Sequence, residues 1–175
     1  MPISQIQSAS LASGVPASSN MPTGSVLQVV QATTQTAVVV NTATWTDSNL
    51  SATITPKFAS SKILVMFTQI IRGQNQTSGS YVAVGTQLLR NSTVIWYPIS
   101  DASGPYNINF GSNTSNSPNA RITLSQNYLD SPATTSAITY KTQGRRYDST
   151  SFMTFNENDT VYNSMSVMIL MEIAG

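Results

Sequence analysis

Short runs of β-forming residues, separated by turn residues, are the feature that most constrains how this chain can fold. From residue 26 onward, segments rich in Val, Ile, Thr, Tyr and Phe are interrupted at intervals of roughly eight to twelve residues by Asn, Ser, Gly or Pro. Apolar residues almost never recur at helical spacing. The pattern predicts an all-β domain, and a domain with about ten strands forms a sandwich or a barrel. We predict these strands at residues 26–31, 36–41, 51–55, 62–70, 81–90, 93–97, 106–110, 121–128, 136–143 and 164–173.

The apolar residues also indicate which strand faces are buried. In the segment SATITP, Ala52 and Ile54 alternate with Ser and Thr, which predicts a strand with one face in water. Two other segments are apolar at consecutive positions, so we predict central strands that are covered on both faces. Their residues are Ile63, Leu64, Val65, Met66 and Phe67, and Val167, Met168, Ile169, Leu170 and Met171. In a small sandwich a neighbouring subunit is an economical cover for the second face, and we therefore predict self-association.

Composition excludes several classes of function. The chain has 175 residues, enough for one domain with a real core. Only 9% of residues are charged and the formal net charge is +1, so no strong field attracts nucleic acid. Cys and His are both absent, which removes disulfides, thiolate nucleophiles, imidazole bases and the commonest zinc ligands. The apolar stretches are far shorter than the ~20 residues of a membrane-spanning helix, so we expect no membrane insertion.

The first 24 residues differ in composition from the rest. They hold three Pro, two Gly and many Ser and Ala, and they cannot bury enough surface to fold alone. This segment is either a floppy terminus or an arm that becomes ordered against another protein, and the second interpretation is favoured slightly. The spaced apolar residues that would anchor such an arm are Ile3, Ile6, Leu11 and Val15. We therefore divide the chain into a docking arm, 1–24, and a β-sandwich knob, 25–175.

Few sequence motifs indicate a catalytic or a ligand-binding site. The seven carboxylates lie mostly in predicted turns, and no pair has a spacing that forces both onto one strand face. FNENDTVY, residues 155–162, offers oxygen ligands for calcium, but Asn and Asp are also ordinary turn residues, and the turn is favoured. GRRYD, residues 144–148, could hold a sugar acid or another carboxylate, and a local ion pair at a hairpin tip is the favoured alternative. We expect no catalytic residue, no metal and no cofactor.

Four stretches taken together resemble a known module. They are MPTGSVLQVVQATTQT, WTDSNLSATITPKFASSKILVMF, QLLRNSTVI and NYLDSPATTSAITYKTQ. This ordered set is similar to a module in structural proteins of marine tailed bacteriophages, where it occurs in fibres and other virion appendages. The resemblance runs from about residue 21 to the C-terminus. It implies a jelly-roll-like antiparallel sandwich that forms a homotrimer about a threefold axis, similar in shape to complement-C1q and tumour-necrosis-factor domains.

The resemblance implies a noncatalytic protein of the virion surface, assembled in the host cytoplasm. We expect a trimeric knob joined by its arm to a phage capsid or tail protein, as a capsid decoration, a head fibre or a short tail fibre, because only about 24 residues precede the module. The alternative is a receptor-binding tail-fibre tip that recognises a host cell-surface glycan through its loops. Candidate host-contact residues are Gln74, Tyr106, Asn113 and Tyr147. A glycan depolymerase that uses two carboxylates is the weakest alternative.

Overall fold

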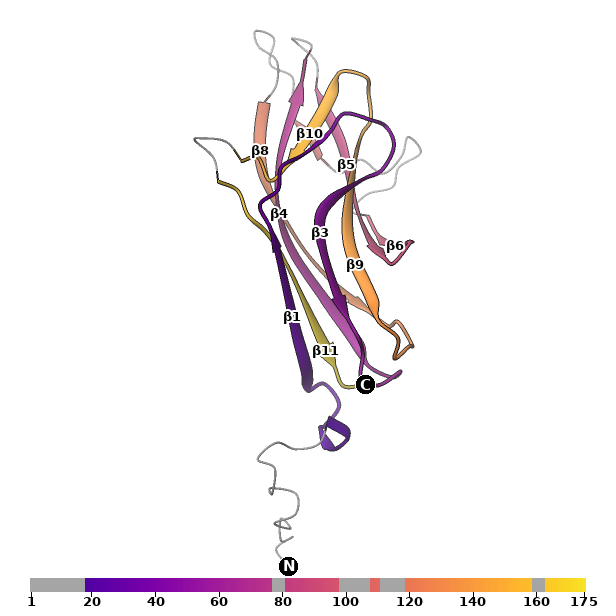
Figure 1. Ribbon diagram of the computed structural model, residues 1–175. Coiled ribbons are helices and arrows are strands. Elements are labelled where there is room, and N and C mark those ends of the chain that lie inside the picture. Colours follow the sequence, from indigo (N-terminus) through magenta and orange to yellow (C-terminus); the bar gives the residue numbers. More distant parts are fainter. Residues whose placement is uncertain (1–17, 77–80, 98–107, 111–118, 159–162) are drawn as a thin grey trace, which may run out of the picture.

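A computed structural model of the chain describes residues 18–76, 81–97, 108–110, 119–158 and 163–175. In these residues eleven antiparallel strands form two sheets that lie face to face (Figure 1). The only helical element of the described part is one 3-10 turn, Ser18–Asn20. No described helix is long and apolar enough to cross a membrane. The predicted all-β class is therefore confirmed.

The first sheet is built around one long strand, β4 (Lys62–Asn75). Along one edge β4 pairs with β8 (Asn119–Asp130). Along the other edge it pairs first with β11 (Ser166–Ile173) and then with β10 (Ser151–Phe155). β1 (Val26–Thr34) lies outside β11, and β2 (Val38–Val40) lies outside β10. The predicted central position of residues 63–67 is confirmed, because β4 has hydrogen-bonded neighbours on both edges.

The second sheet has the order β3-β9-β5-β6, and β7 also pairs with β5. Its strands are β3 (Thr46–Ile54), β9 (Ile138–Arg146), β5 (Val82–Arg90), β6 (Thr93–Trp96) and β7 (Ile108–Phe110). In β3, Ala52 and Ile54 are buried while Ser51 and Thr53 are exposed, as the alternation predicts.

One strand was not predicted from the sequence. All ten predicted segments contain a strand, with ends that differ by up to five residues, but β10 is additional. β10 has only five residues, and four of them are buried. It therefore lacks the alternation of buried and exposed residues by which a strand is recognised in a sequence.

Two groups of apolar side chains fill the space between the sheets. The larger group includes Leu50, Ile54, Ile63, Val65, Phe67, Leu88, Ile138, Tyr140, Met168 and Leu170. The smaller group contains Val40, Ile71, Val82, Val84, Met153 and Phe155. Gly144 of β9 lets the smaller group pack closely, because a Cβ there would lie 2.6 Å from the ring of Phe155. The core thus extends along β4 from Ile63 to Ile71.

The two ends of the sandwich differ. At one end, here called the root end, Gly24 donates a hydrogen bond to the carbonyl of Ala174 (2.8 Å), and Ala174 donates one to Ser25 (2.9 Å). There Lys57 Nζ also donates to Ser18 Oγ (3.0 Å). At the other end, here called the far end, Asn75 pairs with Ser151. Given the rise along a strand, β4 separates the two ends by roughly 40 Å. The first and last strands of the described domain lie side by side in one sheet, because β1 pairs with β11.

Candidate functional site

The outward side of the first sheet carries apolar residues near the root end. In one row across the strands, Val29 pairs with Met171, Met171 with Leu64, and Leu64 with Leu129. In the next row, Ile169 pairs with Met66. We call these six residues, Val29, Leu64, Met66, Leu129, Ile169 and Met171, the outer apolar face. Val29 is 55% exposed and Leu129 is 52% exposed, and the other four are partly exposed.

The predicted cover of the second face of these central strands by a neighbouring subunit stays a prediction. Within one chain only the inward face is covered: Ile63, Val65, Phe67, Met168 and Leu170 are buried. The outward residues of the same runs, Leu64, Met66, Val167, Ile169 and Met171, remain partly exposed. The reason is the two-residue period of a strand, which sends alternate side chains of even a continuous apolar run to opposite sides. Cover for the outward face would have to come from outside the chain.

Further along the same side the face becomes charged. Arg72 of β4 pairs in register with Arg121 of β8. The carboxylate of Glu157 forms ion pairs with both arginines, and its distance to Arg121 Nε is 2.6 Å. Glu157 is 8% exposed. This carboxylate therefore neutralises part of an arginine pair that β-sheet pairing brings together.

These contacts bear on the calcium interpretation of FNENDTVY. Glu157 is engaged by arginines, and Asn156 adopts a positive φ of 51° while its N–H donates to the carbonyl of Ile70 (3.0 Å). Within the described residues no group of three or more Asp and Glu side chains gathers to hold a metal ion. Asn158 forms an isolated bridge with Asn163, and residues 159–162 lie outside the described residues, so the turn stays a prediction for this segment.

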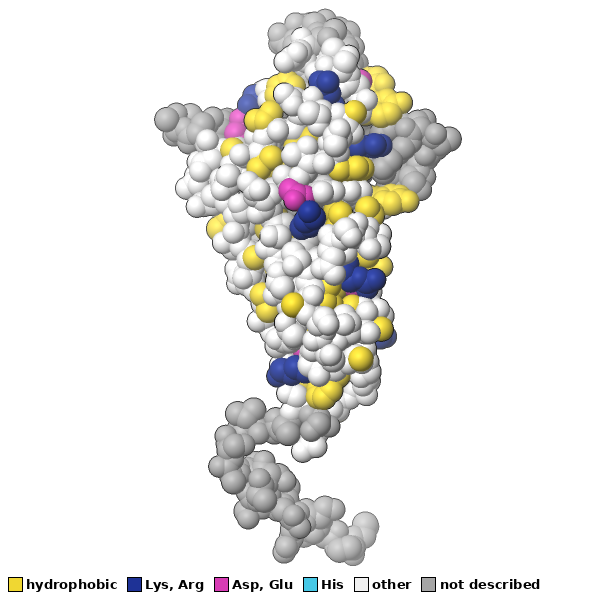
Figure 2. All heavy atoms as spheres, turned by 45° about the vertical axis from the view of Figure 1, so that its right-hand side comes forward, with side chains coloured by type: hydrophobic (Ala, Val, Ile, Leu, Met, Phe, Trp, Pro, Cys, Tyr) yellow, Lys and Arg dark blue, Asp and Glu magenta, His cyan; other side chains and the backbone are white. Residues whose placement is uncertain are grey.

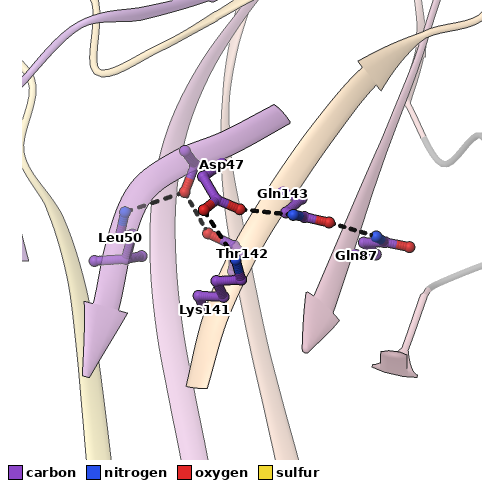
Figure 3. A network of polar contacts seen from close by, with 7 residues as sticks. Asp47, Leu50, Gln87, Lys141, Thr142 and Gln143 are labelled. Atoms are coloured by element: carbon purple, nitrogen blue, oxygen red, sulfur yellow. Dashed lines mark hydrogen bonds and ion pairs between the residues drawn. The ribbon is translucent and has the colours of Figure 1, made fainter. Parts of the chain in front are cut away.

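A polar network crosses the second sheet (Figure 3). Asp47 accepts hydrogen bonds from Lys141 Nζ (2.9 Å) and Gln143 Nε2 (2.6 Å), and Gln143 accepts one from Gln87 (2.7 Å). Burial by itself raises the pKa of Asp47, but the hydrogen bonds from Lys141 and Gln143 outweigh it and hold this pKa below its usual value. The network joins β3, β9 and β5 across the irregular register that follows Asp47, where Asn49 has a φ of 63°. Its side-chain hydrogen bonds link three strands of the second sheet.

The hairpin-tip ion pair predicted for GRRYD is wrong. The carboxylate of Asp148 accepts hydrogen bonds from the backbone N–H groups of Thr150 (2.8 Å) and Ser151 (2.5 Å), and no ion pair joins it to a described arginine. Arg145 instead lies over the ring of Trp45, at 4.8 Å from its centroid. Arg146 Nη1 donates to the carbonyl of Ser149 (2.9 Å). The acidic residue closes its own turn, because the residues that follow it offer nearby N–H and O–H donors.

One buried carboxylate was assigned no role from the sequence. Glu172 of β11 is fully buried near the root end and accepts hydrogen bonds from Gln28 Nε2 (2.5 Å) and from the backbone N–H of Lys57 (2.7 Å). Burial by itself raises the pKa of Glu172, but these hydrogen bonds outweigh it and lower this pKa. A single Glu inside the apolar run VMILMEI was the available signal. Its role is to fasten β1 and the segment after β3 to β11.

The residues predicted for host contact are only partly described. Gln74 is partly exposed on β4, and Tyr147 is 45% exposed directly after β9, so both lie toward the far end. Tyr106 and Asn113 lie outside the described residues, and so do the predicted arm anchors Ile3, Ile6, Leu11 and Val15. The structure therefore bears on two of the four predicted contact residues.

Comparison with known proteins assigns this chain to no family. No known protein family and no curated protein matches the chain. The crystal structure of an infectious bursal disease virus VP2 subviral particle is similar at 12% identity and a TM-score of 0.29, over 85% of this chain and 37% of that one. The structure of the Gt strain of infectious bursal disease virus is similar at 11% identity and a TM-score of 0.25, over 88% of this chain. This chain spans 37% of each of those viral chains. At TM-scores this low, the likeness carries no argument about fold family or function.

Proposed function

We propose that this protein is a noncatalytic structural component of a phage virion. In this proposal the sandwich is a jelly-roll knob, three copies of it assemble on the virion surface, and the N-terminal arm attaches them to a capsid or tail protein. The observation that carries the proposal is the outer apolar face, because partly exposed apolar side chains gathered on one sheet face are typical of surfaces that bind another protein.

The pairing of the strands supports the jelly roll. β1 pairs with β11, β3 with β9, β4 with β8, and β5 with β6 and β7. Early strands thus pair with late strands in nested order, as they do when one long hairpin is rolled into two facing sheets. β2 and β10 form an additional pair at the far end.

The distribution of charge is compatible with close association of identical subunits. The formal net charge is only +1, and the face in Figure 2 shows few charged side chains, scattered among uncharged polar surface. Copies of the chain therefore repel one another weakly. Three copies with their outer apolar faces turned toward a common axis would remove these side chains from water.

The two ends suggest how the knob is oriented. Ser18, where the described part begins, is held at the root end by Lys57. An arm that precedes Ser18 would leave the knob at this end, which leaves the far end to point away from the particle.

Two measurements test the proposal. Sedimentation velocity of the purified chain should give three times the 18.7 kDa mass of one copy. Removal of residues 1–17 should leave this mass ratio unchanged and abolish incorporation into particles. A stable single subunit contradicts the trimer, and incorporation without residues 1–17 contradicts the docking arm.

A second candidate function, recognition of a host surface glycan, is favoured by one specific observation. The far end carries an open hollow of about 350 Å³ that is lined mostly by polar side chains, together with one arginine, one valine and one phenylalanine. A hollow at the outward end of the knob would be accessible to a polysaccharide.

A further inference from the structure

The hollow at the far end, here called the far-end hollow, is built from four separate segments. β2 provides Val39, and the residue after it provides Asn41. The chain after β4 provides Gln76, the end of β9 provides Arg146, and β10 with the turn before it provides Ser149 and Phe152. Its volume of about 350 Å³ lies within the usual range for small-molecule sites. The hollow is open to solvent, and the outer apolar face does not contribute to it.

Arg146 gives the far-end hollow a positive charge. No ion pair joins Arg146 to a carboxylate of the described residues, and nearby Asp148 is engaged by Thr150 and Ser151. Its backbone N–H donates to the carbonyl of Thr42 (2.9 Å), and its Nη1 donates to the carbonyl of Ser149 (2.9 Å). A guanidinium has five N–H donors, so an arginine held in this way retains donors for a ligand.

The other side chains of the hollow suit a sugar. Asn41 and Gln76 carry amide groups, and Ser149 carries a hydroxyl, which can exchange hydrogen bonds with sugar hydroxyls. Phe152 and Val39, which is 59% exposed, offer apolar surface for the C–H groups of a sugar ring. A planar guanidinium matches a carboxylate in a bidentate arrangement.

We propose that the far-end hollow binds a carboxylated sugar, such as a uronic acid residue of a surface polysaccharide. This inference deepens the second candidate function, and its use in host contact rests on that function. Binding itself requires neither the trimer nor the docking arm. Arg146 would bind the carboxylate, and Asn41 and Ser149 would contact the hydroxyls.

The experiment is a calorimetric titration of the full chain with a trisaccharide of galacturonic acid. The methyl ester of the same trisaccharide removes the negative charge and serves as the ligand control. Arg146→Gln removes the positive charge of the hollow. Arg145→Gln removes the neighbouring charge, which lies on Trp45 and does not line the hollow. Asn41→Ala keeps the charge of Arg146 and removes one amide of the hollow.

We expect the unmodified chain to bind the acidic trisaccharide. Arg146→Gln and the methyl ester should each weaken binding about tenfold or more, the range for a lost charge-assisted hydrogen bond. Arg145→Gln should change the affinity by less than about twofold, because this charge does not line the hollow and salt screens its effect there. Asn41→Ala should weaken binding by about fivefold, the effect of one ordinary hydrogen bond.

Three results would overturn the inference. The first is that the folded chain does not bind the acidic trisaccharide. The second is that the methyl ester binds as tightly as the acid. The third is that Arg145→Gln and Arg146→Gln weaken binding of the acid equally. Circular dichroism confirms that each variant is folded. Sedimentation of the same samples reports the proposed trimer separately, so a failed sugar site and a failed assembly are distinguishable.

Discussion

The proposed trimer is tested most directly by placing a charge in the middle of the outer apolar face. Met66→Glu is the perturbation, because Met66 pairs in register with Ile169 and Asn127 and lies at the centre of the first sheet. Met66 is only partly exposed, so complete burial in an interface adds about 1 kcal/mol of hydrophobic stabilisation. For the six side chains of the face this amounts to roughly 6 kcal/mol per subunit.

A glutamate at this position removes that contribution and adds a desolvation cost. Burying a polar group without a partner costs about 2 kcal/mol or more, and a carboxylate costs more than a neutral group. The loss of about 3 kcal/mol at each of three copies should raise the concentration needed for assembly more than a hundredfold. In the separated subunit the same carboxylate reaches water, so the fold should remain intact.

The assay is sedimentation velocity at micromolar concentration, together with thermal unfolding followed by circular dichroism. Met66→Glu should sediment as a folded single subunit, whereas the unmodified chain should sediment as a trimer. Thr53→Glu is the matched control, because Thr53 is exposed on β3 of the opposite sheet. The reasoning fails if Met66→Glu remains trimeric, or if Thr53→Glu dissociates the trimer to the same extent.

Three further predictions concern stability. Glu172 has a lowered pKa in the folded chain, so its contribution to stability is present above its unfolded pKa of about 4.5 and is lost as the pH falls through the folded value. Urea titrations should therefore show that Glu172→Gln reduces the pH dependence of the unfolding free energy below pH ~4.5, and an unchanged acid dependence would contradict this assignment. Gly144→Ala should destabilise the chain by about 1–3 kcal/mol, because the new Cβ meets Phe155, and an unchanged melting temperature would show that this contact relaxes freely. Phe155→Ala should cost about 3–5 kcal/mol in the same unfolding assay, since the ring is fully buried, and a loss below 1 kcal/mol would contradict its place in the core.

Local patterns in the sequence predicted most of the strands. Alternation in residues 51–55 and the continuous apolar run in residues 63–67 are local patterns, and each correctly identified a strand and its burial on the inward face. β10 was missed because its burial comes from its position beside β4 and β2, which no local pattern records. The apolar run itself did not reveal that Leu64 and Met66 face outward.

By itself, the sequence determined the all-β class, most of the strands and the lack of a strong overall charge, because these depend on residue type and on spacing along one segment. Only the tertiary structure decided which polar groups meet. Arg72 and Arg121 share Glu157, and residues 28 and 57 converge on Glu172. Each of these contacts joins strands or turns whose approach is set by sheet pairing. The physical reason is that side-chain periodicity is a property of one strand, whereas hydrogen bonding and desolvation depend on what the other strands bring beside it.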